Sequence, residues 1–303
     1  MKTLLAVFAA TIFLFTPPAL ACGVQVYMHA DVNPEPVKWM YYAMQKNRVC
    51  GDLLSFQTAS SGASDKRHKR GARDTIVFIP AGLEVLYSTD VIYWFHGLTG
   101  FKEKTFVRRL GPQYGWLVNH QQFPAILVVA EMPWSRFTTT QWKRQGQVFR
   151  RKDEFLHYTD EVESHILRHL AWQRIRFDRV VIGHSAGGSA IASAAKYGGL
   201  CKVNPTGIVF SVSTYGGWFA RSWRGCLRDY ARKRAVRIMV LGQSFGAPWK
   251  NYRAWSRKNM SAAKKIEAYR LPLPWTHGRI GNNAIPFFYG RFNSGKYENI
   301  YEK

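Results

Sequence analysis

Residues 179–196 read R-V-V-I-G-H-S-A-G-G-S-A-I-A-S-A-A-K, and this stretch decides the fold. The β-branched run at 180–182 predicts a buried strand, and the small residues that follow Ser185 predict a helix. Between them a serine occupies a sharp turn, Gly183-His184-Ser185-Ala186-Gly187, in which a side chain at either glycine would obstruct close packing. A lone G-x-S-x-G is weak evidence. A strand before it and a helix after it predict a nucleophile held at the end of a strand.

The first 21 residues have the pattern of a secretory signal peptide. Lys2 supplies a positive start, residues 4–15 form a short apolar core, and Ala19-Leu20-Ala21 predicts cleavage before Cys22. The apolar core is too short to span a membrane, and no later stretch is long and apolar enough. We therefore expect a periplasmic or secreted protein with no transmembrane segment in the mature chain. Acylation of Cys22, as in a lipoprotein, is the alternative, and the small residue at position 19 argues against it.

All four cysteines lie in the mature chain, at positions 22, 50, 201 and 226. An even number of cysteines in an oxidising compartment predicts disulfides. Three pairings are open, and we expect the local one, Cys22–Cys50 with Cys201–Cys226, because it closes two modest loops. No C-x-x-C or H-x-x-x-H spacing marks a metal site, and no motif indicates a cofactor.

The expected domain organisation is simple. Residues 22–303 are expected to form a single α/β domain, in which 22–75 is an N-terminal extension and 60–73 an exposed basic loop. Strands are expected at 75–79 and 84–87, as a pair of outer strands, and at 90–95, 125–130, 180–182, 207–212, 237–241 and 265–270. Helices are expected at 36–47, 106–120 (interrupted at Gly111-Pro112 and at Gly115), 152–172 and 249–260. Strands that alternate with helices in this way predict a mostly parallel sheet with helices on both faces.

The charge is strongly basic, with 43 Lys and Arg against 19 Asp and Glu and a net charge of +24. The basic residues are spread over segments 66–73, 143–152, 221–237 and 250–265. This dispersion predicts a cationic shell rather than one nucleic-acid groove, and no nucleic-acid motif accompanies it, so we expect no nucleic-acid partner. For an exported protein we expect attraction to an anionic envelope surface. A merely solvated basic surface is the alternative.

Three landmarks follow one another along the chain: His96-Gly97 ends one predicted strand, G-H-S-A-G follows a later one, and His277-Gly278 comes after the last. In this order they resemble the landmarks of the α/β-hydrolase superfamily, particularly its secreted esterase-like members. The resemblance implies an α/β-hydrolase fold in which Ser185 is the nucleophile and His277 the general base. Such a base is needed because a serine hydroxyl is a poor nucleophile until its proton is removed.

The resemblance also implies an oxyanion hole made by the backbone N–H groups of Leu98 and Ala186. It leaves the triad acid unassigned, because the loop at 242–248, where the family carries it, contains no carboxylate. Asp229 and Glu131 each follow a predicted strand and are the remaining candidates. The side chains of Gln243 or Ser244 are another way to orient the histidine. Loss of the acid from a triad costs about four orders of magnitude in turnover.

Two functions remain open at this stage. The first is an exported serine hydrolase, an esterase or acyl hydrolase, that forms an acyl-enzyme on Ser185 from a small-molecule or glycan-linked ester. Tryptophans near the site would line its pocket, namely those at 134, 142, 218, 223, 249, 255 and 275. The second is a catalytically weakened protein of the same fold that acts as a cationic envelope- or polyanion-binding module. A carboxylate near His277 would favour the enzyme, and a filled pocket beside Ser185 the binding module.

Overall fold

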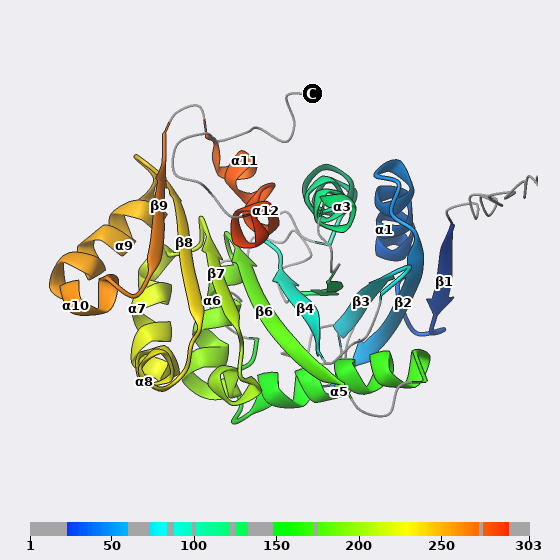
Figure 1. Cartoon of the computed structure of the whole chain (residues 1–303), viewed down its shortest axis with the longest axis horizontal. Coiled ribbons are helices and arrows are strands. Elements are labelled where there is room, and N and C mark those ends of the chain that lie inside the picture. The colour runs from blue at the N-terminus through cyan, green and yellow to red at the C-terminus, as the bar shows by residue number, and fades with distance from the viewer. Residues whose placement is uncertain are drawn as a thin grey trace, which may run out of the picture.

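The computed structural model describes residues 23–59, 73–83, 88–98, 101–120, 125–132, 148–171, 175–272 and 275–290. The expected signal peptide at 1–21, the expected strand at 84–87 and all of the expected basic loop except Arg73 lie outside these residues. Figure 1 shows the arrangement of the elements.

One nine-stranded sheet runs through the described part of the chain, in the order β1-β2-β3-β5-β4-β6-β7-β8-β9. The strands are β1 Val24–Met28, β2 Gly51–Thr58, β3 Arg73–Pro80, β4 Ser88–Phe95, β5 Ile126–Ala130, β6 Arg176–His184, β7 Gly207–Ser211, β8 Arg237–Gln243 and β9 Glu267–Leu271. Each pair from β5 to β9 is parallel, whereas β3 runs antiparallel to both of its neighbours, β2 and β5. The predicted mostly parallel sheet is therefore confirmed.

Helices cover both faces of this sheet, as predicted (Figure 1). They are α1 Pro34–Lys46, α2 Glu103–Thr105, η1 Phe106–Leu110, α3 Gly111–His120, α5 Glu154–His169, α6 Gly187–Ser193, η2 Ala194–Gly198, η3 Leu200–Val203, η4 Tyr215–Gly217, α7 Trp218–Ser222, η5 Trp223–Leu227, α8 Arg228–Lys233, α9 Ala247–Lys258, α10 Met260–Ala263, α11 His277–Gly281 and α12 Ala284–Tyr289. Alternate residues of a strand point to opposite faces, so the sheet divides the core in two. In β4, Tyr93 belongs to the buried cluster that includes residues of α5, α6, α7 and α9, whereas Trp94 belongs to the cluster that includes residues of α1, α3, α11 and α12.

The N-terminal segment adds two strands that the sequence did not predict. β2 pairs with β3 over eight residues, and β1 lies parallel to β2 at the edge of the sheet. The side chains of Ser55 and Thr58 are buried in β2, so its apolar pattern is broken and no strand-like run stands out. β3 lies between β2 and β5, so it is inside the sheet and is not the outer strand that we expected.

The predicted interruption of the helix at 106–120 is wrong. The backbone stays helical from η1 into α3, and Gly111 itself has helical angles, φ −53° and ψ −53°. The glycines instead let α3 approach α1, since a Cβ at Gly115 would lie 2.7 Å from the Asn47 Cβ. Pro112 lies where the π-helical turn of η1 passes into α3.

The predicted Cys201–Cys226 disulfide is confirmed, and it joins η3 to η5. Cys22 lies outside the described residues, so its pairing with Cys50 and its acylation stay predictions. Within the described ranges, no helix combines the length and the apolar composition that crossing a membrane requires.

Candidate active site

The G-H-S-A-G stretch forms the predicted strand, turn and helix. β6 ends at His184, α6 begins at Gly187, and Ser185 between them has a φ of 54°. This left-handed conformation is uncommon for a residue with a side chain, and strained backbone of this kind is concentrated at functional sites. The Ser185 N–H donates to the Ser211 carbonyl oxygen at 2.9 Å, which ties the turn to the end of β7.

Packing around the turn accounts for its glycines. A Cβ at Gly187 would collide with the carbonyl oxygen of Phe95, at the end of β4. A Cβ at Gly183 would lie 2.8 Å from the Gly187 carbonyl oxygen. Gly97 makes a third close approach, because a Cβ there would lie 2.9 Å from the Ser185 Cβ. The turn is therefore closely packed at these glycines, and Ser185 is open on the side of its hydroxyl.

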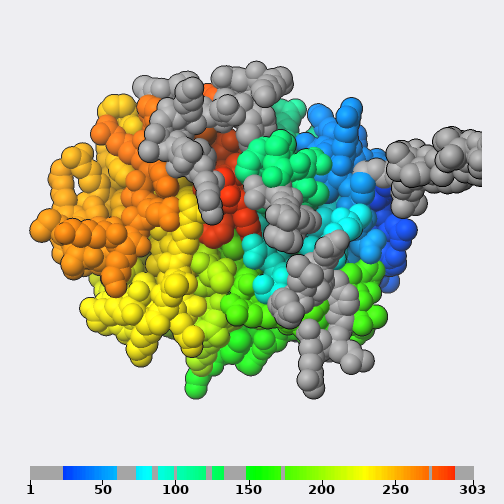
Figure 2. Space-filling model, in the orientation of Figure 1, coloured from blue at the N-terminus to red at the C-terminus, as the bar shows by residue number. Residues whose placement is uncertain are grey.

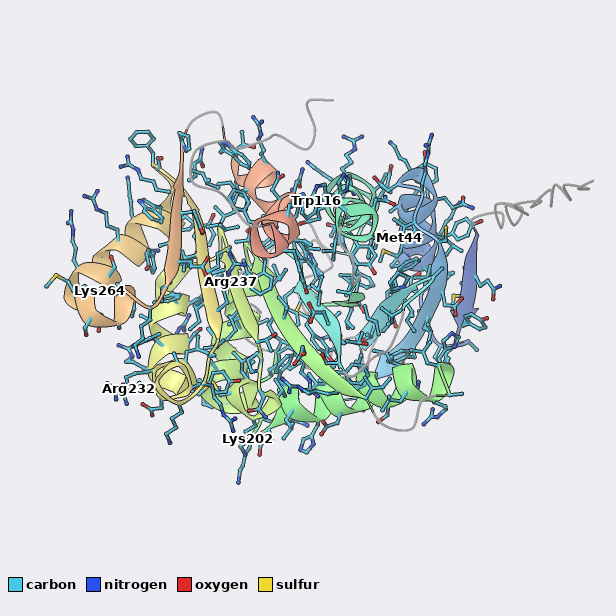
Figure 3. The ribbon with its side chains drawn as sticks, viewed as in Figure 1. Met44, Trp116, Lys202, Arg232, Arg237 and Lys264 are labelled. Carbon is cyan, nitrogen blue, oxygen red and sulfur yellow. A yellow bond between two sulfur atoms is a disulfide. The ribbon has the colours of Figure 1, made fainter. Side chains whose placement is uncertain are left out.

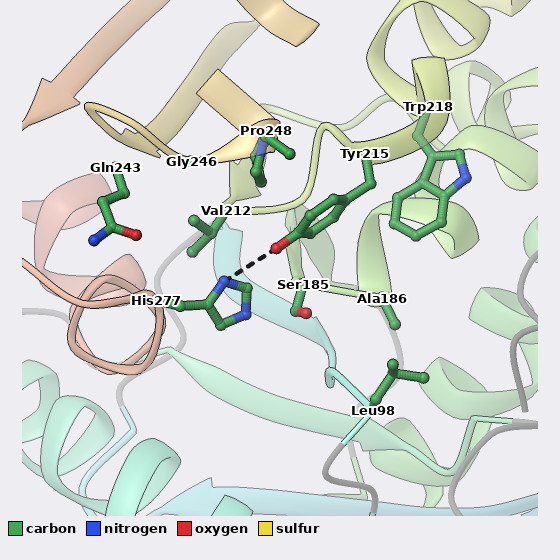
Figure 4. Close-up of a pocket in the computed structure, with 11 residues that line it drawn as sticks. Leu98, Ser185, Ala186, Val212, Tyr215, Trp218, Gln243, Gly246, Pro248 and His277 are labelled. Carbon is green, nitrogen blue, oxygen red and sulfur yellow. Dashed lines mark hydrogen bonds between the residues drawn. The ribbon is translucent and has the colours of Figure 1, made fainter. Parts of the chain in front are cut away.

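That open side is a pocket of about 460 Å³ (Figure 4). It lies where β4, β6, β7 and β8 end, the edge of a parallel sheet where ligand sites form. Its described lining residues are Leu98, Ser185, Ala186, Val212, Tyr215, Trp218, Gln243, Gly246, Ala247, Pro248 and His277. The structure therefore brings all four sequence-predicted site residues, Leu98, Ser185, Ala186 and His277, to one pocket. No carboxylate occurs among these lining residues.

His277 is the first residue of α11 and is half-buried. Its Nδ1 lies 3.3 Å from the Tyr215 hydroxyl oxygen. In Figure 4 its other ring nitrogen lies on the side that faces Ser185, although no hydrogen bond joins the two side chains. Burial, together with the positive charge of Arg109, lowers the pKa of His277 below its usual 6.5. The imidazole is therefore neutral at pH 7, as a general base must be.

A second histidine lies behind the first. The His184 and His277 ring centroids are 5.1 Å apart, and the Arg109 guanidinium lies 3.2 Å from the His184 Nε2. The pKa of His184 lies well below its usual value, because the ring is fully buried and has His277 and Arg109 as neighbours. Its ring packs against Gly281 rather than lining the pocket. His184 therefore does not face the Ser185 hydroxyl across the pocket.

His96 shapes the loop that carries Leu98. It is fully buried, and burial lowers its pKa to about 4. The Met132 N–H donates to the His96 Nε2 at 3.2 Å, so the proton of the neutral ring resides on Nδ1, which donates to the Gly97 carbonyl oxygen at 2.7 Å. The loop is thereby held against Ser185.

Neither carboxylate considered as the triad acid reaches the pocket. Asp229 lies on α8 with its side chain 60% exposed and pairs with Arg228 at 3.1 Å. Glu131 is buried at the end of β5, where its carboxylate lies 3.5 Å from the backbone N–H of Asp74. The Ser244 hydroxyl donates to the Leu271 carbonyl oxygen, and Ser244 does not line the pocket. Gln243 lines the pocket without a hydrogen bond to His277.

Sequence reasoning missed Tyr215 because the search was for a carboxylate. Tyr215 lies four residues after the end of β7, near the strand end at which Asp229 was considered. Burial raises the pKa of the Tyr215 phenol, so this group is neutral at pH 7. Its position shortly after β7 was the one feature of the sequence that could have indicated a partner for His277.

The predicted tryptophan lining is largely wrong. Of the described tryptophans, only Trp218 lines the pocket. Trp223 of η5 and Trp255 of α9 pack edge to face at 5.4 Å, and Trp275 packs against Phe287. The indoles at 134 and 142 lie outside the described residues.

With this geometry established, the comparisons with known proteins identify the family. Residues 70–270 match the family model described as "Putative esterase". The chain belongs to this esterase family. The family lies within the α/β-hydrolase superfamily, and the protein is an esterase-type hydrolase.

Solved structures share the esterase's fold at low sequence identity. The BES protein from Bacillus cereus is 12% identical with a TM-score of 0.51, over 77% of this chain and 92% of that one. A structure named FAE is also 12% identical with a TM-score of 0.51, over 82% of this chain and 92% of that one. An IroE-like serine hydrolase from Shewanella oneidensis is 14% identical with a TM-score of 0.47, over 78% of each chain. A search of curated proteins found no match. The first two likenesses concern the fold, which is that of the α/β-hydrolases.

Proposed function

We propose that this esterase is a serine hydrolase that forms an acyl-enzyme on Ser185 with His277 as its general base. The observation that carries the proposal is the pocket they share, with Ser185 presented on a left-handed turn and His277 neutral beside it. The serine oxygen attacks the ester carbonyl carbon while the histidine Nε2 takes its proton. The same proton then passes to the leaving alkoxide as the ester bond breaks. Water, activated by the same nitrogen, releases the acid and restores the serine.

Leu98 and Ala186 supply the electrostatic part of this proposal. Both line the pocket on the side of Ser185, and their backbone N–H groups are proposed to donate to the oxyanion of the tetrahedral intermediate. Removal of one such donor from a serine hydrolase typically costs about 3 kcal/mol of transition-state stabilisation.

Tyr215 is proposed as a positioning residue in place of the missing acid. If the His277 Nδ1–H donates to the Tyr215 hydroxyl, the lone pair of the ring is on Nε2, which is the atom that must face the serine. A neutral hydroxyl can accept this hydrogen bond, but it can also donate one, and it stabilises the imidazolium of the transition state less than a carboxylate does. We therefore expect turnover below that of a complete triad.

The walls of the pocket indicate a class of substrate. Leu98, Val212, Trp218 and Pro248 are apolar and surround the serine, whereas polar atoms are few. Such a surface favours an ester with a small apolar or aromatic acyl group. Trp218 also offers an aromatic face on which a sugar ring of a glycan-linked ester could stack.

Export belongs to the same proposal. The signal-like residues 1–21 predict secretion or a periplasmic location. The Cys201–Cys226 disulfide supports it, since such bonds persist in oxidising compartments and are rare in the cytosol.

A second candidate function is the catalytically weakened binding module. The observation that favours it is the neighbour of His277 Nδ1, which is a neutral hydroxyl rather than a carboxylate. The open pocket beside Ser185 favours the enzyme, because a binding module has no need to keep the serine accessible.

Treatment of the purified mature protein with a fluorophosphonate, followed by peptide mass mapping, distinguishes the two. We expect one adduct on Ser185, none in Ser185→Ala, and unchanged labelling in Ser189→Ala, whose buried hydroxyl lies on α6. His277→Ala should slow labelling at least a hundredfold, whereas His120→Ala, an exposed histidine at the end of α3, should not. Absence of an adduct on folded wild-type protein would refute the serine-hydrolase proposal.

A further inference from the structure

Positive charge is concentrated at one end of the molecule. Residues 221–265 contain thirteen Lys and Arg and a single acidic residue, Asp229. They include α8, α9 and α10, which lie at the opposite edge of the sheet from α1 (Figure 1). In the space-filling view the orange α9–α10 segment borders the yellow α7–α8 segment (Figure 2). The positive charge that we expected to be spread over the surface is therefore concentrated around α8, α9 and α10.

Within this region α8 and α10 border a groove of about 540 Å³. Four cationic side chains line it, Arg228 and Arg232 from α8, Lys258 from the end of α9, and Lys265 just after α10. No carboxylate lines it among the described residues. Arg232 and Lys264, both labelled in Figure 3, lie at this end of the molecule. The groove shares no lining residue with the Ser185 pocket.

Most of this charge is not neutralised. Asp229 lies 3.1 Å from Arg228 and 4.0 Å from Arg232, so one carboxylate serves two guanidinium groups. Within the described ranges, no carboxylate lies within salt-bridge distance of Lys258 or Lys265. Unpaired cations that converge on a concave surface are the arrangement that binds phosphate groups.

An exposed apolar residue lies among these cations. Met260 lines the groove and is 72% exposed, the largest exposed fraction among the large hydrophobic side chains of the described residues. Trp223, which is buried, forms part of the groove's floor. A soluble polyanion has no contact to offer Met260. A phospholipid surface offers contacts to the cations and to Met260, because its phosphates bind the cations while its acyl boundary accepts the apolar side chain.

We propose that the α8–α10 groove binds the phosphate groups of an anionic phospholipid surface, with Met260 entering the headgroup layer. This binding does not depend on the chemistry at Ser185. Each Lys or Arg near an anionic membrane adds attraction that falls off within a Debye length, about 10 Å in 0.1 M salt. Cations on α1, at the opposite edge of the sheet, therefore contribute little to membrane binding through the groove.

Co-sedimentation with vesicles tests the proposal. The wild-type protein should bind phosphatidylcholine vesicles that contain about a third phosphatidylglycerol, and not phosphatidylcholine alone. Arg232→Gln/Lys265→Gln should weaken this binding roughly 30-fold. The matched control Lys38→Gln/Lys46→Gln removes the same charge from α1 and should change binding less than about twofold. Met260→Ser should weaken vesicle binding roughly threefold or more and leave retention by soluble polyphosphate unchanged.

Two results would overturn the proposal. Equal losses in the groove and α1 double variants would mean that only total charge matters. Tight binding to soluble polyphosphate without binding to vesicles would assign the groove to a polyanion instead. Melting temperature and fluorophosphonate labelling of each variant show whether a loss of binding reflects unfolding.

Discussion

Tyr215→Phe tests the weakest point of the proposed mechanism, the substitute for the acid. The substitution removes one hydroxyl and keeps the ring in the pocket wall. At 3.3 Å the contact between the His277 Nδ1 and the Tyr215 oxygen is longer than a typical N–H···O hydrogen bond. We therefore assign it about 1 kcal/mol, within the usual net range for such a bond, which corresponds to a loss of roughly fivefold in rate. Loss of a carboxylate from a complete triad costs about four orders of magnitude.

The assay measures kcat/KM for p-nitrophenyl acetate and the rate of fluorophosphonate labelling. Tyr230→Phe is the matched control, because its hydroxyl donates to the Pro205 carbonyl oxygen, away from the pocket. We expect Tyr215→Phe to lower both rates with little change in melting temperature or KM, and Tyr230→Phe to leave both rates unchanged.

A double-mutant cycle separates positioning from a general effect on the pocket. If Tyr215 acts through His277, Tyr215→Phe has no further effect on labelling once His277→Ala is present. A wild-type rate in Tyr215→Phe, or the same fivefold loss in the His277→Ala background, would refute the positioning role while the assignment of the serine and histidine stays intact.

Three further predictions concern the same fold. Because burial and Arg109 lower the pKa of His277, the neutral base persists in acid, and the acid limb of a pH–kcat/KM profile should lie below pH 6.5; Arg109→Met should move that limb to higher pH, and an unchanged limb would argue against the electrostatic effect. Gly97→Ala would place a Cβ 2.9 Å from the Ser185 Cβ, so the rate of fluorophosphonate labelling should fall at least tenfold with little change in melting temperature; a wild-type rate would contradict the close packing. Cys201→Ser/Cys226→Ser opens a loop with a sequence separation of 25 and should lower the free energy of unfolding by about 3.5 kcal/mol in urea denaturation, and no loss would mean that this bridge is not formed.

Local patterns were sufficient for the central strands and for the turn at Ser185. β4, β5, β7 and β8 are short apolar runs, and the strand, turn and helix around Ser185 lie within eighteen consecutive residues. Periodicity and backbone preference act over a few residues, so a sequence records them directly. The same rules failed for β2, where Ser55 and Thr58 are buried although their side chains are polar, and for Gly115, whose lack of a side chain allows contact with α1.

The sequence by itself therefore determined the class of fold and the turn that carries Ser185, and it predicted a role for His277, because each depends on residue type and on order along the chain. The tertiary structure alone decided what lies beside the histidine. Tyr215 and His277 are 62 residues apart in the sequence. They meet because η4, which follows β7, and α11 both border the pocket at the ends of the strands. It also decided that Asp229 is used elsewhere, between two arginines at the surface. Partners of a polar group are set by distance in space, and distance in space follows from how remote strands and helices pack together.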